Sequence, residues 1–187
     1  MVIHKELSVK PVKIESPRLQ LRSTVSGDAE LLFKHYFSSV ESSKFLSRLP
    51  HGSIEQTKQF LQKWTVAAWS EAGAPFAWVI SKVDSAEPVG VFLVFPKNHL
   101  AEIHYGISEL HRGQGFATEA CELATHWLLE QSTVQSITTA VDLEHTATQR
   151  VLEKAGFKRD SVLKNHSVLP AFGSAARDAV SYTKSKY

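Results

Sequence analysis

A glycine-containing turn between a strand pattern and a helix pattern constrains this chain more than any other feature. Side chains alternate over residues 101–108, which predicts a strand. Apolar residues recur at three- and four-residue spacing over residues 117–128, which predicts an amphipathic helix. An arginine and two glycines lie between them, in residues 112–115. A further strand pattern at residues 136–141 completes a strand–helix–strand unit, which implies a parallel pair with a right-handed crossover.

The turn has the features of an anion-binding site. Gly113 and Gly115 allow a positive φ and close backbone approach. The first N–H groups of the following helix have no internal partner, and Arg112 can hold a phosphate oxygen. Phe116 follows where a P-loop needs lysine, and Thr118 stands where a dinucleotide fingerprint needs glycine. Judged by the two glycines alone, a tight turn beside a solvent-exposed arginine is as good an interpretation as an anion-binding site.

The remaining patterns predict one mixed α/β domain over residues 1–187, in which residues 1–15 form a loosely ordered arm. A helix is expected to begin at Ser53, because Ser53 and Gln56 have the spacing of a capping box. Another is expected over residues 146–155. Short connections between the early strands favour antiparallel neighbours. The strand patterns lie at residues 19–23, 76–83, 89–95, 101–108, 136–141, 161–166 and 179–183.

Composition excludes several classes of protein. The formal net charge of +2, without a basic patch, argues against nucleic acid or an anionic membrane as partner. The longest apolar run, residues 89–95, is too short to span a bilayer, and residues 1–16 lack an apolar signal region. A single cysteine, Cys121, excludes an intrachain disulfide and fits a cytoplasmic setting. Because it lies in the apolar helix stripe, we expect it in the core.

Residues 112–117, Arg-Gly-Gln-Gly-Phe-Ala, match the Arg/Gln-x-x-Gly-x-Gly/Ala motif of the GNAT acetyltransferases. Residues 16–19 resemble the opening of that family, residues 87–90 its second hairpin and residues 142–157 its late helix motif. Together they resemble the branch that contains the ribosomal-protein-alanine N-acetyltransferases. The resemblance implies the GNAT fold, a mixed sheet of about seven strands, antiparallel in its first half and parallel later, flanked by about four helices.

For the binding site the resemblance implies acetyl-CoA as cosubstrate, with no metal. Tyr105, Gly106 and Ile107 would pair with the pantetheine arm like an added strand. The backbone N–H near Ile107 would face the thioester carbonyl. His145 stands where the motif usually has an asparagine that helps to hold the CoA arm. The pyrophosphate would be held by Arg112, Gly113, Gln114, Gly115, Phe116, Ala117 and Thr118.

For catalysis the resemblance and the strand pattern indicate Glu102 and His104 as candidate bases. Alternation places both on one face of the strand, and the branch usually carries a glutamate at Glu102. The alternative for Glu102 is a surface carboxylate beside a basic neighbour. Many family members have a tyrosine at the position of Leu152 that acts as a general acid toward the leaving thiolate. That general acid is missing here. Thr148, where the branch often has serine, could take part through its hydroxyl or only bond the helix backbone.

The family activity is direct acetyl transfer to a primary amine in a ternary complex. An α-amine has a pKa near 8 and a lysine amine about 10.4, so the α-amine loses its proton more easily near neutral pH. A site whose general base is uncertain therefore suits the α-amino group of a protein or peptide better. A small-molecule amine, amino acid or antibiotic is an alternative acceptor, and a catalytically weak CoA-binding sensor is an alternative role. In the family, the region of residues 37–51 shapes the acceptor pocket. We expect a cytoplasmic monomer or homodimer.

Overall fold

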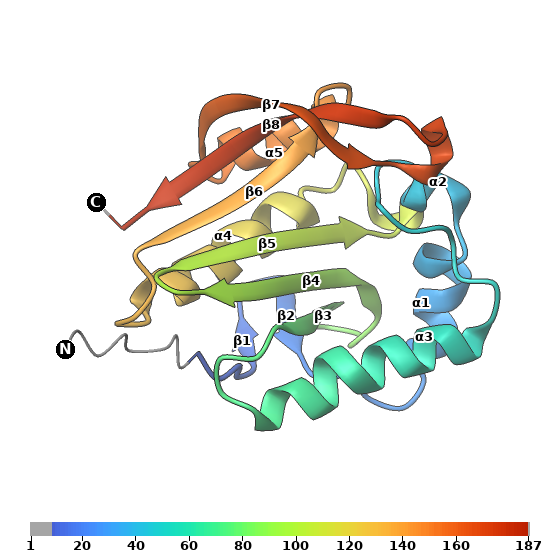
Figure 1. Ribbon diagram of the computed structural model, residues 1–187. Coiled ribbons are helices and arrows are strands. Elements are labelled where there is room, and N and C mark those ends of the chain that lie inside the picture. The colour runs from blue at the N-terminus through green and yellow to red at the C-terminus, as the bar shows by residue number, and fades with distance from the viewer. Residues whose placement is uncertain (1–8, 187) are drawn as a thin grey trace.

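The computed structural model describes residues 9–186, which form an eight-stranded sheet flanked by helices (Figure 1). In spatial order the strands are β1 (Ile14–Glu15), β2 (Leu19–Arg22), β3 (Phe76–Lys82), β4 (Pro88–Lys97), β5 (Leu100–Ile107), β6 (Ser136–Asp142), β8 (Ala176–Ser185) and β7 (Lys158–Val168). The α-helices are α1 (Asp28–Leu32), α2 (Val40–Ser43), α3 (Ile54–Leu61), α4 (Phe116–Glu130) and α5 (Thr146–Lys154). A π-helical turn, η1 (Phe33–Phe37), continues α1.

The strands from β1 to β5 pair antiparallel with their neighbours, as their short connections predicted. After α4, β6 pairs parallel with β5, which confirms the predicted strand–helix–strand unit. The later part of the sheet is otherwise antiparallel, because β7 and β8 form a hairpin and β8 inserts beside β6. Within residues 9–186 the sheet therefore has a single parallel pair, where the sequence led us to expect a parallel second half.

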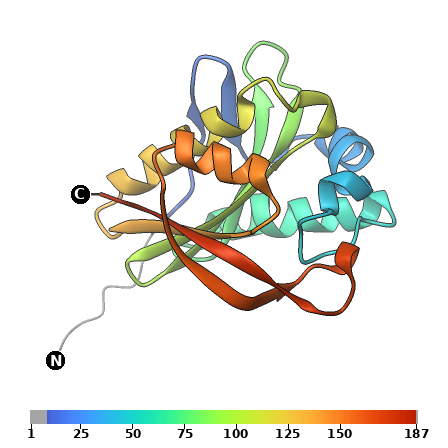
Figure 2. The ribbon, with the colours of Figure 1, turned by 90° about the horizontal axis from the view of Figure 1, so that it is seen from above.

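Helices cover both faces of the sheet (Figures 1 and 2). Successive residues of a strand point to opposite faces. Accordingly, Trp78 and Phe92 lie in the buried cluster that includes α4, whereas Val79 and Val91 pack with α1 and α3. In Figure 1, α3 crosses in front of the sheet and α4 runs behind it. In the described part of the chain, no helix is both long and apolar enough to cross a bilayer.

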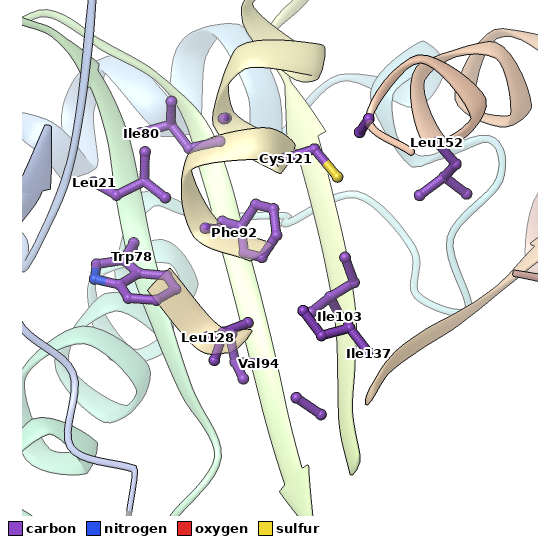
Figure 3. Close-up of a cluster of buried hydrophobic side chains, with 14 of the residues drawn as sticks. Leu21, Trp78, Ile80, Phe92, Val94, Ile103, Cys121, Leu128, Ile137 and Leu152 are labelled. Carbon is purple, nitrogen blue, oxygen red and sulfur yellow. The ribbon is translucent and has the colours of Figure 1, made fainter. Parts of the chain in front are cut away.

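The apolar stripe of α4 packs on the middle of the sheet (Figure 3). Ala120, Cys121, Ala124 and Leu128 are fully buried, as their spacing predicted, and they lie in one cluster with Trp78 of β3. Burial raises the pKa of the Cys121 thiol to about 12. The thiol therefore stays protonated at neutral pH, which agrees with the expected core position and argues against a nucleophilic role.

Residues 9–15 are held against the core, although the sequence suggested a loose arm over residues 1–15. Val9 is fully buried, and the Trp78 indole N–H donates to the Val12 carbonyl at 2.8 Å. The two-residue strand β1 then pairs with β2. A run this short has too little alternation to be detected in a sequence. The first eight residues lie outside the described part of the chain.

A buried ion pair fixes the connection between β2 and α1. The Arg22 guanidinium donates to both carboxylate oxygens of Asp28, at 2.7 and 3.0 Å, and both residues are buried. Asp28 also accepts the Val25 backbone N–H at 2.7 Å, and Arg22 donates to the Ala86 carbonyl at 3.0 Å. Because both terminal nitrogens of the guanidinium and both carboxylate oxygens have partners, the pair can be tolerated in the interior.

We expect Asp28→Ala to lower the free energy of unfolding by about 3–5 kcal/mol, because it leaves the Arg22 charge buried and unpaired. Denaturant titration of both proteins measures the difference. Glu30→Ala is the matched control, since Glu30 is exposed and lies 3.6 Å from Lys58. That variant should change the free energy by no more than about 0.5 kcal/mol. Equal effects of the two substitutions would contradict the importance of the buried pair.

Candidate active site

Two cavities meet beside the C-terminal half of β5. The first, about 470 Å³, contains Glu102, His104 and His166 in its lining and is called the histidine cavity here. The second, about 590 Å³, contains Arg112 and Gly113 and is called the turn cavity. The residues that line both cavities are Tyr36, Phe45, Leu46, Tyr105, His145 and Thr148. These shared residues mark the junction at which a ligand in one cavity can reach a ligand in the other.

Strand β5 presents an open edge at this junction. Residues 100–102 of β5 pair with residues 136–138 of β6, and beyond them the two strands have no paired residues. The Ser108 N–H donates to the Val89 carbonyl on β4 at 2.8 Å. Since alternate amides of an antiparallel strand point in opposite directions, the N–H groups of Tyr105 and Ile107 face away from β4. They face the gap toward β6, where an extended ligand could pair with them.

The glycine turn, residues 112–115, places the start of α4 at one end of this gap. Gly113 has φ +75° and Gly115 has φ +81°, and a Cβ at Gly113 would meet no atom within 4 Å. Gly115 is the N-cap of α4, so the first N–H groups of the helix are directed at the cavity without side-chain caps. Both glycines thus adopt the backbone conformation that their predicted role requires.

A residue from the other end of the chain holds the glycine turn in place. Arg18 donates to the Gln114 carbonyl at 3.0 Å and to the Glu119 carboxylate at 2.7 Å, and its guanidinium lies over the Phe116 ring. Sequence reasoning placed Arg18 in a family motif but assigned it no role. The Gln114 side chain donates to the Leu110 carbonyl at 3.2 Å and does not line the turn cavity, unlike the other predicted residues of the turn and helix start.

Arg112 joins the glycine turn to α2. Its guanidinium donates to the Ser42 hydroxyl at 3.1 Å and lies 4.0 Å from the Glu41 carboxylate. The Arg112 side chain keeps 43% of its surface exposed. A partly exposed guanidinium with a single weak ion pair can exchange that pair for a phosphate.

His145 and Thr148 lie together at the start of α5. The Thr148 hydroxyl is 3.1 Å from His145 Nε2, and the imidazole stacks on the Phe45 ring with centroids 4.2 Å apart. Burial, with a smaller contribution from Arg112, lowers the pKa of His145 to about 4. The ring is therefore neutral at physiological pH, so the histidine replaces an asparagine without adding a charge.

Glu102 and His104 form a hydrogen-bonded pair in the histidine cavity. His104 Nε2 lies 2.8 Å from Glu102 Oε1, and about half of each side chain is exposed. An ionised carboxylate only accepts, so Nε2 carries the proton in this bond, and in the neutral form of the ring Nδ1 keeps a lone pair. The bond from His104 lowers the pKa of Glu102, and the nearby His166 acts in the same direction. The strand pattern had predicted that these two side chains share a face, and the structure brings them into contact.

The walls of the histidine cavity include four phenylalanines, which are Phe37, Phe45, Phe60 and Phe95. Arg48 and His166 add polar groups that sequence reasoning missed. The guanidinium of Arg48 lies 5.0 Å from the Phe37 ring centroid. Arg48 lies within residues 37–51, which were expected to shape an acceptor pocket, but that prediction did not single it out, and it does not extend to His166.

Residues 18–158 match the family described as the acetyltransferase (GNAT) domain, so the chain belongs to the GNAT acetyltransferases. The uncharacterized N-acetyltransferase YoaA of Bacillus subtilis (strain 168) is 30% identical over 156 residues, covering 82% of this chain and 86% of YoaA. The uncharacterized N-acetyltransferase p20 of Bacillus licheniformis is 24% identical over 150 residues, covering 80% and 84%. The family membership that the glycine motif indicated is confirmed.

Solved structures of acetyltransferases share the fold. A GNAT-family acetyltransferase from Bacillus anthracis superposes with a TM-score of 0.81 at 20% identity, covering 94% of this chain and 99% of that one. RimL, a ribosomal α-N-protein acetyltransferase in complex with coenzyme A, superposes with a TM-score of 0.80 at 18% identity, covering 93% and 98%. These similarities establish the mixed α/β GNAT architecture of the chain.

We expect the His145 ring to titrate near pH 4, which imidazole NMR can measure, with His145→Gln to assign the signal. The ordinary histidine pKa is about 6.5, so the unfolded chain binds this proton first. The contribution of His145 to the free energy of unfolding is therefore complete above about pH 6.5 and is lost as the pH falls toward 4. His145→Gln should therefore lose less stability than the unmodified protein between pH 7 and pH 4.5. A midpoint at the ordinary value would contradict the buried, neutral ring.

Proposed function

We propose that this protein transfers the acetyl group of acetyl-CoA to the α-amino group of a protein or peptide, by direct attack in a ternary complex. The observation that carries the proposal is the junction of the two cavities. One cavity has an anion-binding helix start and an open strand edge, and the other has a carboxylate–imidazole pair. Two substrates can thus meet at the shared wall between an anion site and a base.

The turn cavity fits the chemistry of a CoA thioester. The free N–H groups of Ala117 and Thr118 and the Arg112 guanidinium suit a pyrophosphate. The amides of Tyr105 and Ile107 suit the amide groups of an extended pantetheine chain, and a donor at Ile107 can also stabilise a developing oxyanion. The coenzyme A bound to RimL, a structural neighbour, supports the same ligand here.

The histidine cavity suits removal of a proton from an amine. The free lone pair of His104 Nδ1 can accept the proton, and Glu102 stabilises the imidazolium that forms. Because the α-amine has a pKa near 8, it needs little help from a base near neutral pH. The aromatic walls leave room for an apolar N-terminal residue. The structural similarity to RimL, an α-N-protein acetyltransferase, supports a protein N-terminus as acceptor.

Acetyl-CoA at about 100 times its dissociation constant should stabilise the protein by roughly 2.7 kcal/mol. For a chain of this length that corresponds to a rise in melting temperature of about 5–11 °C. Thermal unfolding with acetyl-CoA, ATP and NADH measures the effect and its selectivity. A shift with acetyl-CoA alone is the expected result. The absence of any shift at millimolar acetyl-CoA would overturn the cofactor assignment.

Glu102→Gln should lower kcat about 10-fold near pH 7 with a peptide acceptor, because it removes the charge that supports proton transfer and only about a tenth of an α-amine with a pKa near 8 is neutral there. The deficit should shrink above pH 8 or so, where the α-amine is already neutral. The affinity for acetyl-CoA should not change, since Glu102 lies in the other cavity.

Glu122→Gln is the matched control, because Glu122 is an exposed carboxylate on α4 outside both cavities. It should retain the kcat of the unmodified protein. If Glu102→Gln also shows normal kcat at every pH, the assignment of the Glu102–His104 pair as base is wrong.

A further inference from the structure

Tyr36 lies at the junction of the two cavities but belongs neither to the glycine turn nor to the Glu102–His104 pair. It belongs to the π-helical turn η1, lines both cavities and is only 4% exposed. A ligand that spans the two cavities would therefore lie beside this side chain. The sequence patterns did not connect Tyr36 with catalysis.

The Tyr36 hydroxyl lies directly on the backbone of β5. A Cβ built at Gly106 would be 2.1 Å from this oxygen. Gly106 shares a face of β5 with Glu102 and His104, because strand side chains alternate. Positions two apart on a strand are about 6.6 Å apart, so the hydroxyl, the imidazole and the carboxylate form a row along β5. The base lies at the amine end of this row, and Tyr36 lies at the end beside the open edge.

We propose that Tyr36 is a catalytic residue, the proton donor to the sulfur of CoA as the thiolate leaves. This assignment rests on the proposed acetyl transfer. The amine nitrogen forms the new C–N bond and gives one proton to His104. The C–S bond then breaks, its electron pair goes to sulfur, and the Tyr36 O–H proton moves to that sulfur. CoA leaves as the thiol, and the phenolate recovers a proton through solvent from the imidazolium.

The acid strength of a phenol suits this step. A cysteine thiol has a pKa of about 8.5 and a tyrosine about 10, so at these ordinary values the proton transfer is uphill by only about 2 kcal/mol. Burial raises the pKa of Tyr36, which keeps the hydroxyl protonated before the reaction. Arg48 and Arg112 act in the opposite direction and would stabilise the phenolate once it forms. These two arginines are the charged groups that act on the hydroxyl, and neither can accept its proton.

Three other positions near the junction are less suitable as the proton donor to sulfur. Leu152, where many family members have tyrosine, is apolar and fully buried. The Tyr105 hydroxyl is buried without a hydrogen-bond partner among the described residues, and the ring belongs to the opposite face of β5. Thr148 is an aliphatic alcohol, a far weaker acid than a phenol, and its hydroxyl is engaged by His145.

The first test compares Tyr36→Phe with the unmodified protein, using an N-terminal alanine peptide and hydroxylamine as acceptors. Hydroxylamine is largely unprotonated at pH 7, so it can attack without first losing a proton to the base, and its acetylation depends less on that base. Tyr36→Phe should lose at least about 100-fold in kcat with both acceptors, while the dissociation constant for acetyl-CoA stays the same. Glu102→Gln should be slow with the peptide and recover with hydroxylamine. Equal recovery of both variants would overturn the role of Tyr36.

Tyr182→Phe is the matched control, because it removes a hydroxyl from a buried tyrosine outside both cavities, bonded to Glu153 at 3.2 Å. It should keep the full kcat. If Tyr36→Phe behaves like this control, the proton-donor assignment is wrong. A loss of acetyl-CoA affinity without a loss of kcat would also overturn it, because the residue would then serve only in binding.

A second test needs no acceptor. At pH 9, where much of the CoA thiol is ionised, the unmodified protein should bind CoA about 10-fold more tightly than desulfo-CoA, because Tyr36 donates to the thiolate. Tyr36→Phe should bind the two ligands equally well. If acetyl transfer fails with every acceptor but this difference holds, the proposed function is wrong and the sulfur contact stands. If transfer occurs and both proteins show the same ratio, only the Tyr36 assignment fails.

Discussion

Backbone N–H groups inside a sheet need acceptors, and along the C-terminal half of β5 the sheet supplies none on one side. The pairing of β5 with β6 ends at Glu102 and Thr138. The divergence leaves the amides of Tyr105 and Ile107 in a gap that also receives the free N–H groups at the start of α4. One ligand with amide groups along its length and phosphates at its end can satisfy both sets of donors. The proposed binding of acetyl-CoA thus depends on the place where the two strands separate.

Close backbone contacts fix the other side of the site. A Cβ at Gly90 would lie 2.1 Å from the Gly106 carbonyl oxygen, and a Cβ at Gly106 would lie equally close to the Tyr36 hydroxyl. Both glycines are therefore required by packing. The π-helical turn has a wider spacing than an α-helix, and it lets Tyr36 and Phe37, adjacent in sequence, both pack toward the sheet with ring centroids 4.9 Å apart. The irregular turn is what delivers a hydroxyl to β5.

The local parts of this architecture could be predicted from the sequence, because their signals lie within a few residues of one another. The glycine turn, α4 and the shared face of Glu102 and His104 follow from glycine spacing, helical period and strand alternation. The place of β8 between β6 and β7 could not be predicted, because strand order depends on pairings between distant segments. The same reason hides Arg18, Tyr36 and His166, which only tertiary packing brings to the site.

The two departures from the family pattern agree with their surroundings. Leu152 belongs to the same fully buried cluster as Cys121 (Figure 3), where an unpaired phenol hydroxyl would be costly. His145 stacks on Phe45 and stays neutral, so it does not repel the charge of Arg112 beside it. Under the proposed assignment, Tyr36 on η1 (Phe33–Phe37) would supply the hydroxyl that is missing at Leu152. Because η1 also lines the histidine cavity, a substitution there would be expected to affect the proposed acceptor site and the proposed acid together.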